Sequence, residues 1–317
     1  QTGKGVSDFH TGDRVVSNGN HAEYVVVNQN LCTRIPDNTD IKEASFTVLG
    51  SIALHGLRLS ETSLGSKVVV IGLGIIGQLV CRLAEAQGSE VIGIDPDTKR
   101  TDMSANFYTS VEEANMTNVD SVIITAATSS NEPIEVATKI ARNKAKIVVV
   151  GDIPLNISRN DFYYKELELV VSKSYGPGRY DKQYEILGKD YPIEYVRWTE
   201  NRNFEAFIKL LSQNQIHLLD LVTEEVSFEN APSIYKKFSG EDKPLSIVLR
   251  YDNKSEPKID LQRTVELEPK TEKVNLGILG AGNFASTTIL PILKELKKDC
   301  QVLGIASSTG LSSESLA

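Results

Sequence analysis

The hydrophobic pattern between residues 67 and 172 predicts strands that alternate with helices. Residues 67–71 contain a continuous apolar run, typical of a strand buried on both faces, and further strands are predicted at 91–94, 119–125, 146–151 and 167–172. Between these strands, apolar residues recur at helical spacing, as at 79–84 and 132–143. This alternation predicts an α/β fold with a doubly wound parallel sheet.

The residues before this region have a different pattern. Residues 15–16 and 22–27 have the composition of strands, and Asn18-Gly19 favours a tight turn between them. Residues 41–59 are predicted to form one helix, which carries the chain toward the first buried strand. The first 35 residues are therefore expected to be β-rich.

The residues after position 172 repeat both kinds of element. A helix is predicted at 204–211, and strands at 222–228 and 245–251 flank a helix at 231–238. Residues 252–272 are rich in Asp, Lys and Glu and contain two prolines, which indicates a linker. A new strand at 274–279, a glycine turn, a helix that runs to 296 and a strand at 302–306 then restart the pattern.

A G-x-G-x-x-G motif follows the first buried strand. Gly72 allows the tight turn, Gly74 lets the backbone approach a pyrophosphate, and Gly77 lets the helix pack closely on the strand. Asp95 ends the second strand, about 20 residues after the central glycine, where a carboxylate binds an adenosine ribose diol. The motif predicts an NAD site, in which a carboxylate disfavours the 2′-phosphate of NADP. A glycine-rich turn of some other α/β protein is the alternative.

Further cofactor-binding residues are predicted from their position. Leu73, Ile75 and Ile76 complete the glycine turn, whose helix N-terminus presents free N–H groups to phosphates. Ligands of such sheets bind beyond the carboxyl ends of the strands, where the chain places Thr125, Ala126 and Gly151. These last three are equally well explained as ordinary residues between a strand and a loop.

A second glycine motif, G-x-G-x-x-A, follows residue 279. The residues predicted to bind a dinucleotide there are Gly280, Gly282, Asn283, Phe284 and Ser307. No carboxylate ends the second strand of this unit, and hydroxyl groups do not exclude a 2′-phosphate, so either NAD or NADP is compatible. A turn without a cofactor is the alternative.

Composition narrows the function further. The net charge of −8 and the lack of a Lys/Arg cluster argue against nucleic-acid binding. No apolar run approaches the ~20 residues of a membrane span. The three cysteines are scattered and form no metal-binding pattern, so a reduced, cytoplasmic setting is expected. Both ends look cut, and we expect a fragment of a longer protein.

The first 251 residues resemble the medium-chain dehydrogenase/reductase family, which includes the zinc alcohol dehydrogenases. The resemblance rests on residues 12–15, 22–27, 35–37 and 44–57, on the glycine motif with Asp95, and on 245–251. It implies a partial GroES-like β-domain at 1–45 and a Rossmann domain at 46–200. Residues 201–251 would complete the Rossmann domain and return the chain to the β-domain. After the linker at 252–272, residues 273–317 resemble the start of a Gfo/Idh/MocA-type oxidoreductase, often active on sugars.

The resemblance also bears on the catalytic groups. The late zinc ligand of the family falls at about Thr47, a poor ligand, and no cysteine cluster marks a structural zinc, so we predict no metal. His21, Tyr24 and Thr47 are candidates for the proton donor, and each is also explained as a solvated or core residue. His55 lies in an apolar helix and is expected in the core.

Two hypotheses of function follow. The first is an oxidoreductase that transfers hydride between a nicotinamide and a hydroxyl or carbonyl carbon of a small, sugar-like molecule in the cleft between β-domain and Rossmann domain. The second is a dinucleotide-binding sensor or scaffold without catalysis. A homodimer agrees with what is common in the family. The substrate and the direction of reaction do not follow from the sequence.

Overall fold

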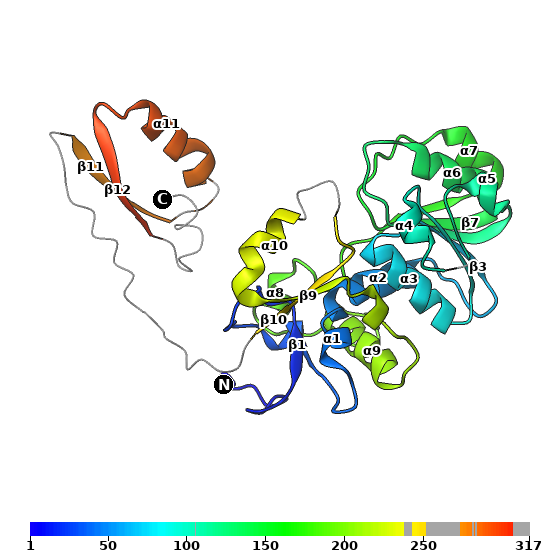
Figure 1. Cartoon of the computed structure of the whole chain (residues 1–317), viewed down its shortest axis with the longest axis horizontal. Coiled ribbons are helices and arrows are strands. Elements are labelled where there is room, and N and C mark those ends of the chain that lie inside the picture. The colour runs from blue at the N-terminus through cyan, green and yellow to red at the C-terminus, as the bar shows by residue number, and fades with distance from the viewer. Residues whose placement is uncertain (105, 238–242, 252–272, 281, 283, 307–317) are drawn as a thin grey trace. The chain divides into compact units, whose positions relative to one another are not determined.

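The chain forms two compact units, Gln1–Asn253 and Lys254–Ala317. A computed structural model describes residues 1–104, 106–237, 243–251, 273–280, 282 and 284–306 (Figure 1). The predicted linker at 252–272 lies outside the described residues. The division predicted inside the first unit, at residues 45 and 200, stays a prediction.

A six-stranded parallel sheet forms the centre of the first unit. Its strand order is β5-β4-β3-β6-β7-β8. The strands are β3 (Lys67–Ile71), β4 (Glu90–Ile94), β5 (Phe107–Tyr108), β6 (Val119–Ile124), β7 (Ala141–Val149) and β8 (Glu168–Val171). The chain starts in the middle of the sheet, moves to one edge and then returns to build the other. This confirms the predicted doubly wound α/β fold.

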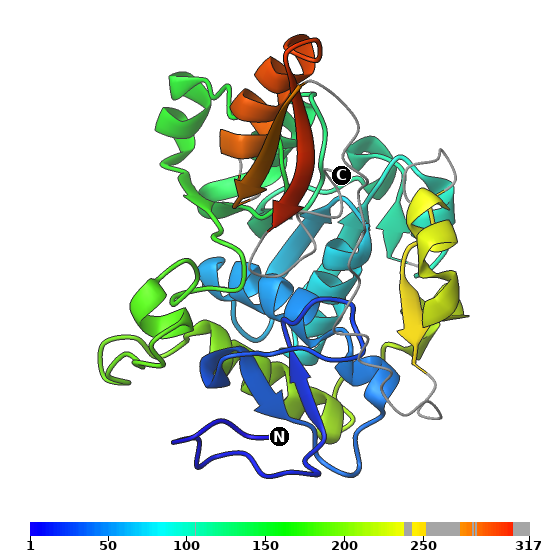
Figure 2. The ribbon, with the colours of Figure 1, turned by 90° about the vertical axis from the view of Figure 1, so that its left-hand side faces the viewer.

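Helices bury both faces of this sheet (Figure 2). Val68 and Val70 of β3 pack with α2 (Thr47–Leu59), α3 (Ile75–Ala86) and α9 (Glu200–Ser212). Val69 and Ile71 of the same strand pack on the other side with α6 (Glu132–Ile140). Successive strand residues point to opposite faces, so a strand covered on both sides must be apolar throughout.

Short helices and turns complete the first unit. They are α1 (Ile41–Ala44), α4 (Thr98–Thr101), α5 (Val111–Ala114), α7 (Arg159–Lys165), α8 (Lys182–Glu185) and α10 (Ala231–Lys237), with 3-10 turns at Gln29–Leu31, Leu219–Leu221 and Phe228–Asn230. The predicted helix at 41–59 is broken between α1 and α2. The predicted helix at 132–143 ends at Ile140, and β7 begins five residues earlier than predicted.

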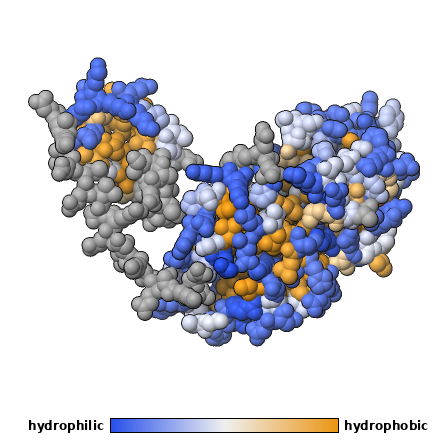
Figure 3. Space-filling view, in the orientation of Figure 1, coloured by the Kyte–Doolittle hydropathy of each residue, from blue (hydrophilic) through white to orange (hydrophobic). Residues whose placement is uncertain are grey.

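Two small pairs of strands lie outside the large sheet. β1 (Val15–Ser17) pairs antiparallel with β2 (Cys32–Arg34), and β9 (Glu224–Ser227) pairs parallel with β10 (Ile247–Arg250). β9 and β10 confirm the two late strands and the helix α10 between them. On the face shown in Figure 3, hydrophobic patches interrupt a mostly hydrophilic surface near these two strands.

The predicted strand at 22–27 is wrong. These residues form bends and loop, with Val26 fully exposed, and β1 pairs instead with β2. The tight turn at Asn18-Gly19 does not form either, because neither residue has the positive φ that a type I′ turn requires. The chain therefore makes a loop from residue 18 to 28 before it returns to β1.

The helices α2 and α9 meet around the single tryptophan. The Arg58 guanidinium lies 3.3 Å from the centre of the Trp198 ring, and Arg197 lies 3.8 Å from it. Arg58 also donates to the Asn203 side chain of α9 at 3.1 Å. The half-buried indole is thus held between two cations at the start of α9.

The second unit begins as a strand–helix–strand. β11 (Val274–Leu279) pairs parallel with β12 (Cys300–Ala306), and between them a π-helical turn at Ala285–Ile289 leads into α11 (Leu290–Glu295). This arrangement is the one predicted from the second glycine motif. Among the described residues of both units, no helix is long and apolar enough to cross a membrane.

Candidate dinucleotide site

The first glycine motif forms a tight turn between β3 and α3. Gly72 has φ 98°, in the left-handed region that favours glycine. A Cβ on Gly77 would lie 1.9 Å from the Gly72 carbonyl oxygen, so only glycine allows α3 to pack this closely on the turn. A Cβ on Gly74 would meet nothing within 4 Å. The space beside Gly74 is therefore open at the N-terminus of α3, where phosphates bind in such folds.

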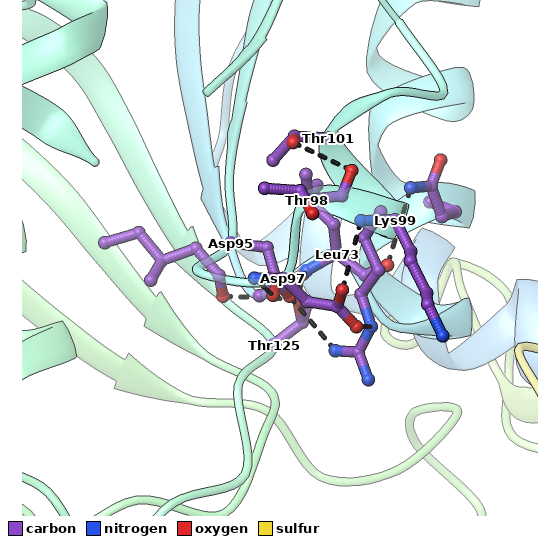
Figure 4. A network of polar contacts seen from close by, with 11 residues as sticks. Leu73, Asp95, Asp97, Thr98, Lys99, Thr101 and Thr125 are labelled. Carbon is purple, nitrogen blue, oxygen red and sulfur yellow. Dashed lines mark hydrogen bonds and ion pairs between the residues drawn. The ribbon is translucent and has the colours of Figure 1, made fainter. Parts of the chain in front are cut away.

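Asp95 is fixed against this turn (Figure 4). Its Oδ2 accepts a hydrogen bond from the Leu73 amide at 2.7 Å, and its Oδ1 accepts one from the Asp97 amide at 2.9 Å. The carboxylate is 4% exposed and follows β4 directly. The acid at the end of the second strand and the glycine turn of the first strand are thus one hydrogen-bonded structure.

Arg100 also belongs to this structure, although the sequence motif did not point to it. Its guanidinium lies 3.1 Å from Asp95 Oδ2 and 3.4 Å from Asp97 Oδ2. Asp97 caps α4 by accepting from the Lys99 amide, and this short helix turns Arg100 back toward Asp95. Asp97 is the residue from which Arg100 could have been predicted. An aspartate favours the start of a helix, and one helical turn after Asp97 brings Arg100 back to Asp95.

The predicted residues at the neighbouring strand ends meet the same turn. The Thr125 hydroxyl donates to the Gly72 carbonyl at 2.5 Å, and the Ala126 amide donates to the Ile71 carbonyl at 3.1 Å. A Cβ on Gly151 would lie 2.0 Å from the Ala126 carbonyl oxygen. The structure thus brings together the carboxyl ends of β3, β6 and β7, where such sheets bind ligands. Contact of Thr125, Ala126 and Gly151 with a cofactor stays a prediction.

A cleft of about 1000 Å³ extends from the start of α3. Ile75, the first residue of that helix, is part of its wall. Apolar residues of α1, α2 and their connection form another part, and the β1 region with the following loop faces them. A space of this size holds a small molecule, and it adjoins the glycine turn.

The three predicted proton donors occupy different surroundings. Thr47 is fully buried, and its hydroxyl donates to the Ala44 carbonyl at 2.6 Å. Tyr24 is 68% exposed. Of the three, His21 alone is part of the cleft wall, where its Nδ1 makes a 2.5 Å hydrogen bond with the Tyr235 hydroxyl. The structure therefore does not bring these three residues together.

Two buried ionisable groups flank the loop after β8. Burial and the nearby Arg58 cation lower the pKa of His55 to about 4, so His55 is a neutral core residue, as predicted. Burial, with a smaller effect of Glu185, raises the pKa of Glu200 to about 8, although Arg179 and Lys173 oppose this rise. Neither Glu200 carboxylate oxygen has a hydrogen-bond partner among the described residues.

The residues around Thr47 do not fit a zinc ligand set. A threonine hydroxyl is a weak zinc ligand, and this one is already bonded to a backbone carbonyl. Within the described part of the chain, no three His, Cys, Asp or Glu side chains are grouped to hold a metal ion. Absence of zinc stays a prediction, since this observation concerns only the described residues.

The second glycine motif is described in part. Gly280 follows β11 and has φ 102°, as the first glycine of such a turn requires. A Cβ on Gly282 would meet nothing within 4 Å, and Phe284 is 69% exposed. Two predicted residues of this motif, Asn283 and Ser307, lie outside the described residues.

Known proteins similar to this chain are dehydrogenases. Residues 50–160 match the family model of the D-isomer specific 2-hydroxyacid dehydrogenase NAD binding domain. D-guloside 3-dehydrogenase of Escherichia coli is 25% identical over 261 residues, which cover 75% of this chain and 70% of that protein. 2-Dehydro-3-deoxy-L-galactonate 5-dehydrogenase of Pseudoalteromonas atlantica is 26% identical over 169 residues, 49% of each chain.

A solved structure shows the same fold. Galactitol-1-phosphate dehydrogenase from Escherichia coli superposes with a TM-score of 0.64 at 20% identity, over 78% of this chain and 80% of that one. None of the matched regions named here is confined to residues 273–317, so the resemblance of that unit to the Gfo/Idh/MocA type stays a prediction. The first unit therefore has the α/β fold of the medium-chain dehydrogenases, with their parallel dinucleotide-binding sheet.

Proposed function

We propose that this chain is an NAD(P)-dependent oxidoreductase of the alcohol dehydrogenase type, acting on a hydroxyl or carbonyl group of a sugar or polyol. The observation that carries the proposal is the glycine turn with Asp95 hydrogen-bonded to it, beside an open Gly74. The two sequence relatives named above are dehydrogenases of sugar derivatives, which supports the substrate class. A bound nicotinamide would supply or accept the hydride.

For the cofactor, we propose a preference for NAD over NADP. The Asp95 carboxylate lies where it would accept hydrogen bonds from a ribose diol and repel a 2′-phosphate. Arg100, 3.1 Å from this carboxylate, offsets part of that repulsion. The preference is therefore expected to depend on Asp95 and to reverse when Asp95 is removed and Arg100 remains.

The test is a fluorescence titration of NADH and NADPH. In the Asp95→Ser variant, the ratio of the two dissociation constants should shift toward NADPH by about tenfold or more, which corresponds to roughly 1.4 kcal/mol. Asp95→Asn keeps an oxygen for the Leu73 amide and should shift the ratio in the same direction. Asp161→Ser, at an exposed aspartate of α7, is the matched control. An unchanged ratio in both Asp95 variants would show that Asp95 is not the ribose ligand.

We further propose that catalysis does not use zinc. The support is the bonded and buried Thr47 hydroxyl at the position of the late zinc ligand. Metal analysis of the purified protein should give far less than one zinc per chain, and a chelator should leave turnover unchanged. Zinc near one per chain, lost together with activity, would contradict this part of the proposal.

We also propose that the second unit contributes a second dinucleotide site. Its support is the parallel pair β11 and β12 with the left-handed Gly280 between strand and helix. Calorimetric titration of the full chain should give two NADH or NADPH equivalents per chain. One equivalent, abolished by substitution in the first glycine turn, would restrict dinucleotide binding to the first unit.

A sensor or scaffold without catalysis is the second candidate. It is favoured by the observation that none of Thr47, His21 and Tyr24 is placed as an evident proton donor. NADH oxidation in the presence of a panel of ketoses separates the two functions. Binding of NADH without turnover of any ketose would favour the sensor.

A further inference from the structure

The loop at residues 173–180, called here the tyrosine loop, has an unusual backbone. Four of its residues have positive φ: Ser174 (50°), Gly176 (110°), Gly178 (106°) and Tyr180 (67°). Residues other than glycine rarely adopt this conformation, and it persists where surrounding contacts enforce it. The loop follows β8, at the carboxyl end of the sheet where ligands bind.

Contacts from α9 hold the tyrosine loop in place. The Asn203 side chain donates to the Tyr175 carbonyl at 2.9 Å, and the Glu200 amide donates to the Pro177 carbonyl at 2.8 Å. A Cβ on Gly176 would lie 2.9 Å from the side-chain nitrogen of Asn203, so the loop lies directly on α9. The backbone of Tyr175 is therefore fixed on a regular helix.

The side chain of Tyr175 is fixed as well. The residue is 5% exposed, and its ring lies 5.5 Å from the Phe204 ring, with the Arg179 guanidinium 5.1 Å from its centre. Its hydroxyl oxygen accepts a hydrogen bond from the Asn18 side chain at 3.1 Å. Because the oxygen accepts from Asn18, the hydrogen of the hydroxyl remains available as a donor.

Tyr175 and Asn18 are both part of the wall of the cleft that begins at Ile75. Two other polar groups of this wall have partners of their own. Arg14 donates to the backbone carbonyls of residues 37 and 39, and His21 is bonded to a tyrosine hydroxyl. Tyr175 thus lies in the wall of a cleft that adjoins the glycine turn, and its hydroxyl donates to no residue in the described part of the chain.

We propose that Tyr175 is the acid–base residue of the reaction, and that its hydroxyl binds and protonates the carbonyl oxygen of the substrate. This inference rests on the proposed oxidoreductase function. In the direction of reduction, the carbonyl π bond breaks, the carbon gains a C–H bond with the hydride that the bound nicotinamide supplies, and the oxygen gains the proton of Tyr175. The carbonyl carbon is reduced, and the dihydronicotinamide is oxidised.

Neighbouring groups support both protonation states. Burial is the largest cause that raises the pKa of Tyr175 above its ordinary value, so the hydroxyl holds its proton at neutral pH. After transfer, the Asn18 amide and the Arg179 cation stabilise the tyrosinate, and both lower its pKa. A water molecule that enters the cleft then restores the proton.

The test compares Tyr175→Phe with Tyr184→Phe in the full chain. The Tyr184 hydroxyl is also buried, and it donates to the Thr199 hydroxyl at 2.9 Å, but Tyr184 is no part of the cleft wall. NADH-dependent reduction of D-xylulose, D-fructose and D-tagatose is measured together with NADH affinity. We expect Tyr175→Phe to lower kcat by about 10²–10⁴-fold, while its NADH affinity stays within about twofold of the wild-type value. Tyr184→Phe should keep kcat within about threefold of the wild-type value.

Two further measurements separate catalysis from folding. Binding of xylitol to the protein with NADH, followed by calorimetry, should weaken about fivefold or more in Tyr175→Phe through loss of one hydrogen bond. Asn18→Leu keeps the tyrosine but removes its stabilising amide, so the alkaline limit of the kcat profile should move to higher pH. This second variant tests the proposal if Tyr175→Phe does not fold.

The outcomes distinguish the inference from the proposed function. If the wild-type protein reduces a ketose and Tyr175→Phe keeps the wild-type kcat, the assignment of Tyr175 is wrong and the proposed oxidoreductase function stands. The same holds if Tyr184→Phe lowers kcat as much as Tyr175→Phe does. If the wild-type protein binds no NADH and reduces none of the three ketoses, the proposed function and the assignment both fail.

Discussion

Replacing Glu200 with glutamine should remove a large pH dependence of stability. Glu200 is the first residue of α9 and is fully buried, with neither oxygen partnered among the described residues. Burial, followed by the Glu185 charge, raises its pKa from 4.5 to about 8. In the folded protein the carboxyl group therefore keeps its proton at neutral pH.

The sign of the effect follows from proton linkage. Between pH 4.5 and about 8, the unfolded chain has an ionised Glu200 while the folded chain has a protonated one, so unfolding releases a proton. The free energy of unfolding consequently falls as the pH rises through this range. At about 1.4 kcal/mol per unit, the upper limit of the loss is ~5 kcal/mol, a large share of the roughly 5–15 kcal/mol that stabilises a typical domain.

The assay is urea unfolding between pH 5 and pH 9, followed by circular dichroism. The Glu200→Gln variant has no charge at this position, so its stability should exceed that of the wild type increasingly from pH 5 to pH 8. The difference should then stay constant, because the wild-type carboxyl is ionised in both states. Glu112→Gln, at an exposed residue of α5, is the control. A difference that does not vary with pH would refute the reasoning.

Two further predictions concern the glycine turn and the cysteines. Gly77→Ala, whose Cβ would lie 1.9 Å from the Gly72 carbonyl oxygen, should lower thermal stability, whereas Gly74→Ala, whose Cβ meets nothing, should keep the fold and weaken NADH binding about tenfold or more. Equal melting temperatures for the two variants would contradict this. Burial raises the pKa of the Cys81 thiol and raises that of the half-buried Cys32 to about 11. At pH 8, Cys81 should therefore not react with a thiol reagent until urea unfolds the protein, and Cys32 should react more slowly than a free cysteine. Rapid labelling of the folded chain at either residue would show that the thiol is accessible.

The dinucleotide site could be predicted because its residues are close in sequence. The glycine turn, α3 and Asp95 belong to one strand–helix–strand unit, in which short-range sterics fix the geometry. Arg100 was also within reach, since the cap formed by Asp97 places it. The same local logic predicted the strands and helices of the large sheet.

The side chains that line the cleft could not be predicted in the same way. Asn18 and Tyr175 are 157 residues apart, and no local pattern indicates that their side chains meet. The predicted strand at 22–27 is wrong for a related reason. A pattern of apolar residues does not show which segment will pair with β1, and β1 pairs with β2 instead of with residues 22–27. Likewise, the sequence offered Thr47 as a donor, but the carbonyl that its hydroxyl binds is visible only in the folded chain.

The position of Trp198 has an optical consequence. It is the single tryptophan of the chain and lies between the guanidinium groups of Arg58 and Arg197, at the start of the helix that holds the tyrosine loop. Its emission therefore comes from this one corner of the first unit. A ligand that rearranges the tyrosine loop would change that emission, while the circular dichroism of the helices stays the same.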